Sequence, residues 1–332
     1  MNSMTGNGNK LKQFVVQFRS VGTLAILAIL FVGAAIATPE HTFVGTANIN
    51  NLLSIGAEFG IIALGVGVLM IAGEFDLSVG SVLAFCSFLF TWFYGLVGSI
   101  YVAVLLTLIC GALIGTLHGL ITVKGHIVSF IATLGAMLSW RGLTEILSGG
   151  KIRSLAFEPD SLFAQLFSAR LGDILPIQFV WFILFAAILY LALNRGRFGN
   201  WIYATGDNPM AARAMAVDTH LVKIVCFAIV GFLCAFSSVI QTARVTAFST
   251  HMGTGWELQA VAAAVVGGVS LRGGRGSMIG IFVGALIIIV IDNMIGQLRL
   301  AYEWTYMAFG IVILGAALLD LIIEKRIQRA SA

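Results

Sequence analysis

Long apolar runs separated by short polar segments occupy almost the whole chain. A helix needs about 20 mostly apolar residues to cross the hydrocarbon core of a bilayer. The runs that meet or approach this length cover residues 21–38, 55–72, 78–96, 100–123, 126–147, 177–193, 222–245, 256–271, 278–298 and 304–321. The pattern predicts an all-α polytopic membrane protein with about ten transmembrane helices, folded as a single membrane domain over residues 21–321.

The polar segments predict what lies between these spans. Residues 148–176 form a long polar loop that we expect outside the cell, and residues 194–221 form a basic loop that we expect inside. Residues 46–53 predict a short helix at the membrane interface. The run at 256–271 is short and rich in Ala and Gly, so it is either a complete span or a re-entrant one.

The basic residues set the orientation of this arrangement. Most of the 19 Lys and Arg residues fall in segments that it places in the cytoplasm, as is usual for membrane proteins. Both termini are therefore expected in the cytoplasm, as an N-terminal segment at 1–20 and a tail at 322–332. Residues 10–37 also resemble a secretory signal, but the apolar run is long for one, so we expect it to remain as the first span.

The composition agrees with a membrane protein and argues against other classes. Hydrophobic residues make up 59% of the 332 residues and charged residues only 10%, against about 25% in soluble domains. The net charge of +4 comes without a basic run interleaved with aromatic residues, so we expect no nucleic-acid partner. All four cysteines lie in apolar runs and are expected to be small core residues; they are Cys86, Cys110, Cys226 and Cys234.

The usual signatures of enzymes are missing from the sequence. The histidines lack the spacing of a zinc hydrolase, and there is no Gly-x-Ser-x-Gly motif. No glycine-rich loop ends in the Gly-Lys-Ser/Thr that holds phosphates in ATP-binding proteins. The chain is therefore expected not to be an enzyme and to hold no cofactor or metal of its own.

An acidic break interrupts the apolar sequence at residues 73–81, which read Gly-Glu-Phe-Asp-Leu-Ser-Val-Gly-Ser. Acidic residues are costly in lipid, so the break lies either at the membrane face or unwound in a protein-lined cavity. Asp76 is expected to cap the following helix, because a carboxylate stabilises a helix N-terminus. The alternative role for Asp76 is to line the transport path, together with Ser78, Gly80 and Ser81.

Further polar residues lie inside the predicted spans. Arg141 and Glu145 are four positions apart, so they can form an ion pair on one helix face. Asp292 and Asn293 lie late in the run at 278–298, where they line either a cavity or the seam between two copies of the chain.

Glycine patterns predict close packing and a second break. The Gly-x-x-x-Gly pairs at 111–115 and 280–284 favour close contact between helices. Residues 267–277 resemble residues 73–81, since each segment joins an apolar helix to another through a polar turn that contains glycine. The similarity indicates either an internal repeat, as in many transporters, or chance in a glycine-rich chain.

The basic loop contains a helix signal. Asn208 is a good N-cap, Pro209 suits the first helical position, and residues 210–216 are strong helix formers. The expected short helix lies flat at the cytoplasmic face. It is either an ordinary amphipathic connector or a docking site whose small side chains fit a partner's groove.

Three segments in this order carry a resemblance to a known family. They are residues 73–81, residues 132–142 (Ala-Thr-Leu-Gly at the start and Arg-Gly at the end) and residues 206–213 (Gly-Asp-Asn-Pro, then Ala-Ala-Arg). Together they resemble the permease subunit of bacterial ABC importers of the ribose, xylose, galactose and autoinducer-2 type, which is related to branched-chain amino acid permeases. Residues 262–276 and 304–320 extend the match. Glu74 departs from the family, which often has Gly at this position.

The resemblance implies a set of partners and a location. It implies a second permease subunit (another copy or a sister chain), ATPase subunits that bind ATP and Mg, and a periplasmic binding protein. It also places the chain in the bacterial inner membrane. On this pattern the short helix is the coupling helix that contacts the ATPase, and its residues are Gly206, Asp207, Asn208, Pro209, Ala211, Ala212 and Arg213.

The expected function is therefore that of a permease subunit that moves a monosaccharide or a small polyol. The nearest alternatives are ABC permeases for another small solute, namely autoinducer-2, a branched-chain amino acid or a nucleoside. A stand-alone secondary transporter driven by ions is a different class, and a membrane-embedded enzyme is a third. Uptake by this chain alone under an ion gradient would indicate the secondary transporter.

Overall fold

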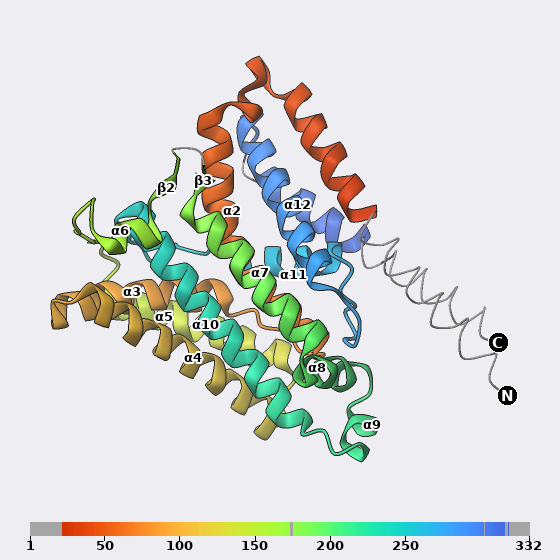
Figure 1. Cartoon of the computed structure of the whole chain (residues 1–332). Helices are drawn as coiled ribbons and strands as arrows, with labels where there is room; N and C mark the ends of the chain where they lie inside the picture. The colour runs from red at the N-terminus through yellow and green to blue at the C-terminus, as the bar shows by residue number, and fades with distance from the viewer. Residues whose placement is uncertain (1–21, 173–174, 302, 316–317, 319–332) are drawn as a thin grey trace.

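The structure is a computed structural model that describes residues 22–172, 175–301, 303–315 and 318 (Figure 1). Six helices in this part are long and apolar enough to cross a membrane. They are α2 (Thr46–Ile71), α3 (Val79–Val97), α4 (Ile100–Lys124), α7 (Ile177–Arg195), α10 (Thr219–Val245) and α12 (Met278–Gln297). Each lies on a predicted span. The cytoplasmic segments expected at 1–20 and 322–332 lie outside the described residues.

The other four predicted spans are also helical but shorter or more polar. Helix α5 (Ser129–Ser148) is long enough to cross a membrane, but it is less apolar than the six helices above. Gly22–Ala37 and Glu303–Gly315 are shorter apolar helices. Helix α11 (Trp256–Val266) has 11 residues and is about 16 Å long, so it is too short to cross the core by itself.

The connections differ from the sequence-based predictions in three places. The separate interfacial helix predicted at 46–53 is wrong, because these residues form the first turns of α2. The basic loop contains two helices, α8 (Arg197–Asp207) and α9 (Pro209–Ala214), of which only the second is predicted. The segment before α2 forms a 3-10 helix, η1 (Pro39–Val44).

The polar segment 148–176, predicted to be external, contains structure that the all-α prediction lacks. It holds helix α6 (Leu162–Phe167) and three short strands, β1 (Arg153–Ser154), β2 (Arg170–Leu171) and β3 (Leu175–Pro176). Strands β2 and β3 pair with each other. Strand β1 pairs antiparallel with β4 (Ala247–Phe248), so it connects this segment to the end of α10.

Helix α2 is the centre of the bundle. It contacts α7, α10, α11 and α12, and nearly all its residues are buried. Its glycines allow this crowding, because each leaves room for a neighbouring side chain. Gly60 lies against Phe182 of α7, and Gly67 lies against Ile281 of α12. Without these glycines the surrounding helices would have to move outward.

Close helix packing at the predicted glycine pairs is confirmed. Helix α4 crosses α10 where Gly111 and Gly115 face Gly231, and a Cβ atom on any of them would overlap the opposite backbone. Gly280 and Gly284 of α12 lie in the same way against the backbone of α11. The four cysteines are free, and three of them are fully buried among apolar residues.

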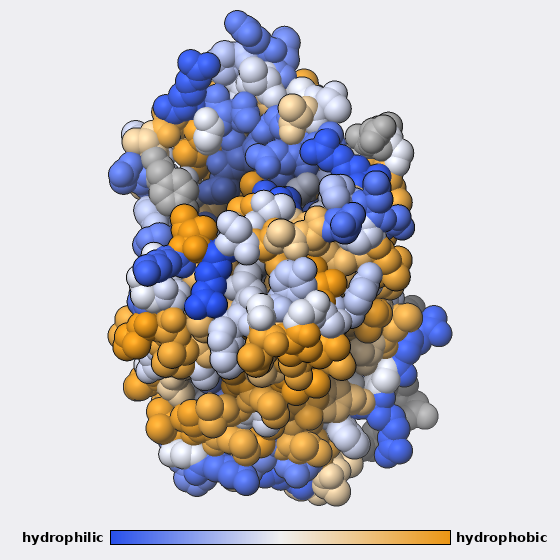
Figure 2. All heavy atoms as spheres, turned by 90° about the vertical axis from the view of Figure 1, so that its left-hand side faces the viewer, coloured by the Kyte–Doolittle hydropathy of each residue, from blue (hydrophilic) through white to orange (hydrophobic). Residues whose placement is uncertain are grey.

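One face of the molecule shows where lipid fits. Figure 2 shows a band of hydrophobic side chains across the lower half of this face, with hydrophilic side chains below it and a more polar region above. Helices α4 and α5 carry many exposed apolar residues, including Leu105, Leu113, Ile131 and Leu138. A band of this kind between two polar zones is the surface expected of a membrane protein.

Candidate functional site

The break after α2 begins with a defined helix cap. Gly73 has a left-handed backbone, and its amide donates to Met70 O while the Glu74 amide donates to Leu69 O (3.2 Å). This pair of hydrogen bonds is the Schellman motif, which ends a helix at a glycine. Residues 72–78 then run without regular structure until α3 begins at Val79. The break predicted from the sequence is therefore confirmed.

Asp76 organises the unwound segment from within the protein. It is 2% exposed, and its Oδ1 accepts hydrogen bonds from the Ser78 amide (2.8 Å) and the Ser78 hydroxyl (2.5 Å). Helix α3 starts at the next residue, so the carboxylate orders the turn that precedes the first helical residue. The predicted cap at Asp76 is wrong, because Ser78 is the N-cap residue of α3 and no side chain caps the helix; Asp76 instead orders the turn just before it.

A chain of hydrogen bonds continues from Asp76 to α4 and α5. Trp140 Nε1 donates to His118 Nε2 at 2.8 Å, and the indole can only donate, so the proton of a neutral His118 is on Nδ1. His118 Nδ1 then donates to the Ser78 hydroxyl at 3.2 Å and lies 3.6 Å from Asp76 Oδ2. His118 and Asp76 are both almost completely buried, so the carboxylate is held by donors instead of water.

Helix α5 supplies the remaining partners of the unwound backbone. The Phe75 amide donates to Ser129 Oγ, and the Leu77 amide donates to Thr133 Oγ1, each at 3.1 Å. Irregular backbone inside a membrane protein is stable only where its polar groups have such partners. Thr133 belongs to the Ala-Thr-Leu-Gly segment, and this hydrogen bond gives that motif a structural reason.

Glu74 has a partner that the sequence does not reveal. It forms an ion pair with Lys223, near the start of α10, and the two side chains are 12% and 19% exposed. The ion pair connects the break after α2 to the N-terminal end of α10. Lys223 lies 149 positions further along the chain, so no spacing rule could have matched them.

A second buried ion pair was missed by sequence reasoning. Glu58 in the middle of α2 is fully buried, and Arg244 at the end of α10 binds it with two hydrogen bonds, Nε to Oε1 at 2.6 Å and Nη2 to Oε2 at 3.0 Å. Ser237 also donates to the Glu58 backbone carbonyl at 2.6 Å. The available signal was a lone acid within an apolar run.

Arg141 makes different contacts from those predicted. Its Nη1 donates to the backbone carbonyls of Thr250 and Met252, in the loop before α11. No ion pair joins it to Glu145 in the described part of the chain, so the predicted pair is replaced by this contact. The loop before α11 has no regular secondary structure, so its backbone carbonyl oxygens can accept hydrogen bonds from the guanidinium.

Gly80 and Ser81 lie in the first turn of α3 and are buried. A Cβ atom on Gly80 would overlap Gly253 O and would lie 2.6 Å from Glu257 Oε2. Gly80 therefore allows α3 to lie directly on the loop before α11. Both residues are therefore buried in the packing between elements. Their predicted position on a transport path stays a prediction.

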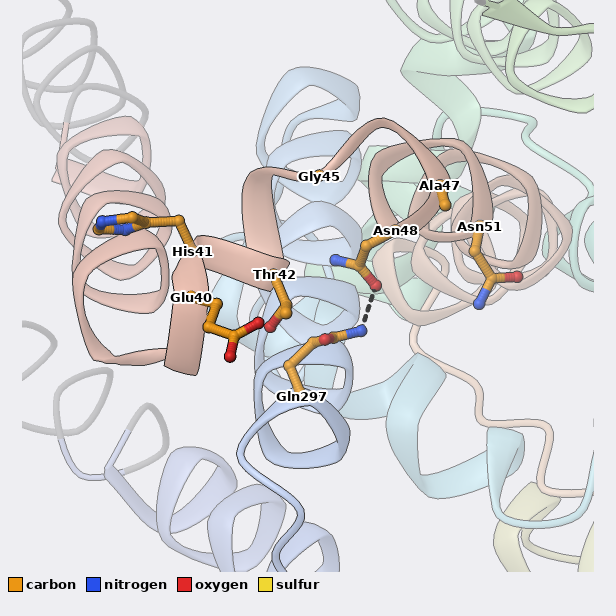
Figure 3. Close-up of a pocket in the computed structure, with 8 residues that line it drawn as sticks. All are labelled: Glu40, His41, Thr42, Gly45, Ala47, Asn48, Asn51 and Gln297. Carbon is orange, nitrogen blue, oxygen red and sulfur yellow. Dashed lines mark hydrogen bonds between the residues drawn. The ribbon is translucent and has the colours of Figure 1, made fainter.

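Asp292 and Asn293 lie at the opposite end of the molecule from α9, beside two hollows. Asp292, Asn293 and Asn51 line a hollow of about 250 Å³ between α2 and α12, and a wider one of about 650 Å³ adjoins it. Figure 3 shows the wider hollow, in which Gln297 reaches Asn48 while His41 points away. The walls of both hollows are rich in amide groups.

Hydrogen bonds order these amides. Asn48 and Asn293 exchange two hydrogen bonds (2.8 and 2.9 Å), and Gln297 Nε2 donates to Asn48 Oδ1 at 2.6 Å. The amide of Asn51 and the carboxylate of Asp292 are on the lining of the smaller hollow. Amides can donate to and accept from hydroxyl groups, and a carboxylate can accept from them.

Helix α9 is capped as the sequence predicts. Asn208 Oδ1 accepts hydrogen bonds from the amides of Met210 (3.1 Å) and Ala211 (3.0 Å), which confirms it as the N-cap. Met210 and Met215 are 81% and 80% exposed, whereas Ala212 is 4% exposed and faces the protein. An exposed apolar side chain thus lies at each end of this short helix, and we call Met210 and Met215 together the tip of α9.

Two residues of the predicted set fix α9 to its neighbours. Arg213 Nε donates to Thr219 Oγ1 at 2.9 Å, at the start of α10. Gly206 lies at the end of α8, where its Cα atom approaches the backbone of the break after α2. Asp207 and Pro209 complete the turn between α8 and α9.

Comparison with known proteins identifies the family. A protein-family model described as "Branched-chain amino acid transport system / permease component" matches residues 48–317, most of the chain. The chain belongs to this permease family. No solved structure matches it at a significant level.

The permease is similar to several importer subunits over nearly their whole length. It is 34% identical over 298 residues to "Ribose import permease protein RbsC" of Escherichia coli (strain K12), covering 89% of this chain and 92% of the relative. It is 32% identical to "Autoinducer 2 import system permease protein LsrC" of Salmonella choleraesuis, with 96% and 90% covered. It is 32% identical to "Xylose/arabinose import permease protein XylH" of Sulfolobus acidocaldarius, with 97% and 88% covered.

The permease is thus a transport component of an import system and a multi-pass protein of the inner membrane. Its family agrees with the resemblance in the sequence, including the relation to branched-chain amino acid permeases. The resemblance did not supply three sets of polar contacts, namely Glu74 with Lys223, Glu58 with Arg244, and the amide cluster around Asn48.

Proposed function

We propose that the permease is the membrane subunit of an ATP-driven importer that moves a monosaccharide or a small polyol into the cell. Relatives covered over most of their length are named for the import of ribose and of xylose or arabinose, which supports a sugar cargo. Another relative is named for autoinducer 2, so that solute is the nearest alternative cargo. The ordered amides and Asp292 at the hollows agree with a cargo that carries hydroxyl groups.

The observation that carries the proposal is the apolar tip of α9. Met210 and Met215 are the most exposed large apolar side chains of the described residues, and they protrude from a basic surface segment. Flexible thioether side chains adapt well to a groove on a partner protein. We assign that groove to an ATPase subunit, which binds ATP and Mg, while this chain holds neither.

The remaining parts of the importer follow from this assignment. The permease has about ten spans with both termini in the cytoplasm, and it pairs with a second permease, either another copy or a sister chain. A periplasmic binding protein delivers the cargo at the end of the molecule that carries Asp292 and Asn293. ATP binding closes the ATPase subunits and shifts α9, so that the spans change between outward-open and inward-open states.

A charge placed on the tip of α9 tests the assignment. The double variant Met210→Glu, Met215→Glu should no longer co-purify with the ATPase subunits, and uptake of labelled sugar should fall about tenfold or more, since burying unpaired charge costs over about 1.4 kcal/mol. Insertion and yield in the membrane should stay normal. Variants of Ala212 would be less informative, because this residue packs against the protein.

Asn200→Glu is the matched control, because Asn200 is exposed on α8 and lies away from the tip. It should leave co-purification and uptake unchanged. Normal uptake by the double methionine variant would refute docking at α9. The cargo is tested separately, by the thermal shift of the cognate binding protein with ribose, xylose and leucine. Stabilisation by leucine alone would overturn the sugar assignment.

A further inference from the structure

Three segments that are far apart in the sequence bring their backbones close together at the end of the molecule that carries α9. They are the break after α2 at Gly73, the end of α8 at Gly206, and the turn between α11 and α12 at Gly273 and Gly274. A Cβ atom on Gly273 would lie 2.7 Å from Gly73 Cα and 3.1 Å from Gly206 O. A Cβ atom on Gly206 would overlap Ile71 O. We call these four glycines the glycine contact.

Hydrogen bonds connect the same three segments. The Gly274 amide donates to Ile71 O at 2.8 Å, so the turn after α11 satisfies a carbonyl at the end of α2. Tyr203 of α8 donates from its hydroxyl to Gly276 O at 3.0 Å. A tyrosine hydroxyl is protonated at neutral pH, and burial raises the pKa of Tyr203 further, so this group remains a donor.

The position of the glycine contact relates it to transport. Gly206 is separated from the N-cap of α9 by one residue, and α8 and the loop between α11 and α12 lie side by side in Figure 1. Any displacement of α9 along α8 therefore acts on the ends of both α2 and α11. A contact between backbones has no side-chain rotamers to absorb such a displacement, so the parts move together.

We propose that the glycine contact is the positioning element that transmits motion from α9 to the two helix breaks, so that both breaks respond as one unit. Its residues touch neither cargo nor ATP. The proposal rests on the proposed function for the meaning of that motion, but the coupling between the segments is a property of the permease alone. A first experiment therefore uses the permease without partners.

Hydrogen exchange on the purified chain in lipid nanodiscs measures this coupling. In the Gly206→Ala variant, exchange should rise about tenfold or more in residues 203–209 and also in residues 69–76 and 270–277, because the segments separate together. Gly135→Ala is the matched control, since both glycines have ordinary helical backbone and Gly135 has open space around it. An increase confined to residues 203–209 would overturn the proposal.

A second variant removes one bond without adding volume, in case Gly206→Ala does not fold. Tyr203→Phe loses only the hydroxyl that binds Gly276 O, and it should raise exchange in residues 270–277 as well as locally. Tyr190→Phe on α7 is its control, because that side chain is 40% exposed. Unchanged exchange at 270–277 in Tyr203→Phe would also count against the proposal.

The assembled importer supplies the functional readout. With the ATPase subunits and the loaded binding protein present, Tyr203→Phe should hydrolyse ATP at a normal rate and import about fivefold less labelled ribose per ATP. A purely structural defect would lower hydrolysis and uptake together, and that outcome would overturn the transmitting role. If the unaltered permease imports no sugar with its partners, the proposed function fails while the exchange result stands by itself.

Discussion

The two helix breaks of this permease, after α2 and after α11, begin with the same helix cap but are held in place by different contacts. At the first, Gly73 donates to Met70 O, and at the second, Gly268 donates to Val265 O, each as part of a Schellman motif at the end of a helix. After that the first break is held by side chains around Asp76, whereas the second is held by close backbone contacts at Gly273 and Gly274 and by one side-chain bond, from Tyr203 to Gly276 O.

The difference shows two ways of stabilising unwound chain inside a membrane protein. Side chains extend from the backbone before they donate or accept hydrogen bonds. The backbone of the first break therefore lies at some distance from α4 and α5, and the space between them holds the buried carboxylate of Asp76. Glycine removes the side chains, so the second break lies directly on the first and on α8. The first should therefore be sensitive to side-chain removal and the second to side-chain addition.

The common cap also bears on the predicted repeat. By their caps the equivalent residues are Gly73 and Gly268, one position from the alignment that the sequence pattern suggests. The next helices differ in their caps, because Ser277 accepts from the Gly280 amide while Ser78 makes no such bond. An internal repeat stays a prediction.

The largest effect is expected from side-chain addition at the second break. Gly274→Ala places a Cβ atom 2.6 Å from Asp207 Cα on a left-handed backbone, and it should cost about 3 kcal/mol or more of stability. Gly98→Ala is the control, because Gly98 has nearly the same backbone angle and open space around it, so it should cost only about 1 kcal/mol. Thermal unfolding in detergent measures both. Equal losses would show that the close approach is unimportant.

A smaller loss is expected from side-chain removal at the first break. Asp76→Ala leaves the Ser78 amide and hydroxyl without their acceptor, which should cost about 2–3 kcal/mol. Asp160→Ala, at an exposed position, should change stability by less than about 0.5 kcal/mol. Thermal unfolding in detergent measures the stability of both variants. If Asp76→Ala is as stable as the unaltered chain, the hydrogen bonds around Asp76 do not hold the break.

The smallest effect is expected from the ion pair beside the first break. Glu74→Gln and Lys223→Met should each destabilise slightly, and a double-mutant cycle should give a coupling of about 1 kcal/mol, because both side chains are partly exposed. Raising the salt concentration should reduce this coupling. A coupling energy of zero would mean that Glu74, which stands where the family often has Gly, does not stabilise the contact between α2 and α10.

Local sequence signals predicted those helices and breaks that are determined by residues close together in the chain. The apolar runs place the six helices of the described residues that are long and apolar enough to cross a membrane, and Asn208 places the start of α9. Glycine between an apolar run and an acidic residue marks the break at Gly73. Each of these depends on residues within a few positions of one another, so one sequence contains the whole signal.

The sequence alone therefore determined the class of protein, the positions of the six long apolar helices, the helix break at Gly73 and the family resemblance. Only the tertiary structure decided that Glu58 pairs with Arg244, that Glu74 pairs with Lys223, and that Arg141 binds the loop before α11 instead of Glu145. It also brought Gly73, Gly206 and Gly273 together. These contacts join positions that are far apart in the chain, and only the packing of the helices sets which of them meet.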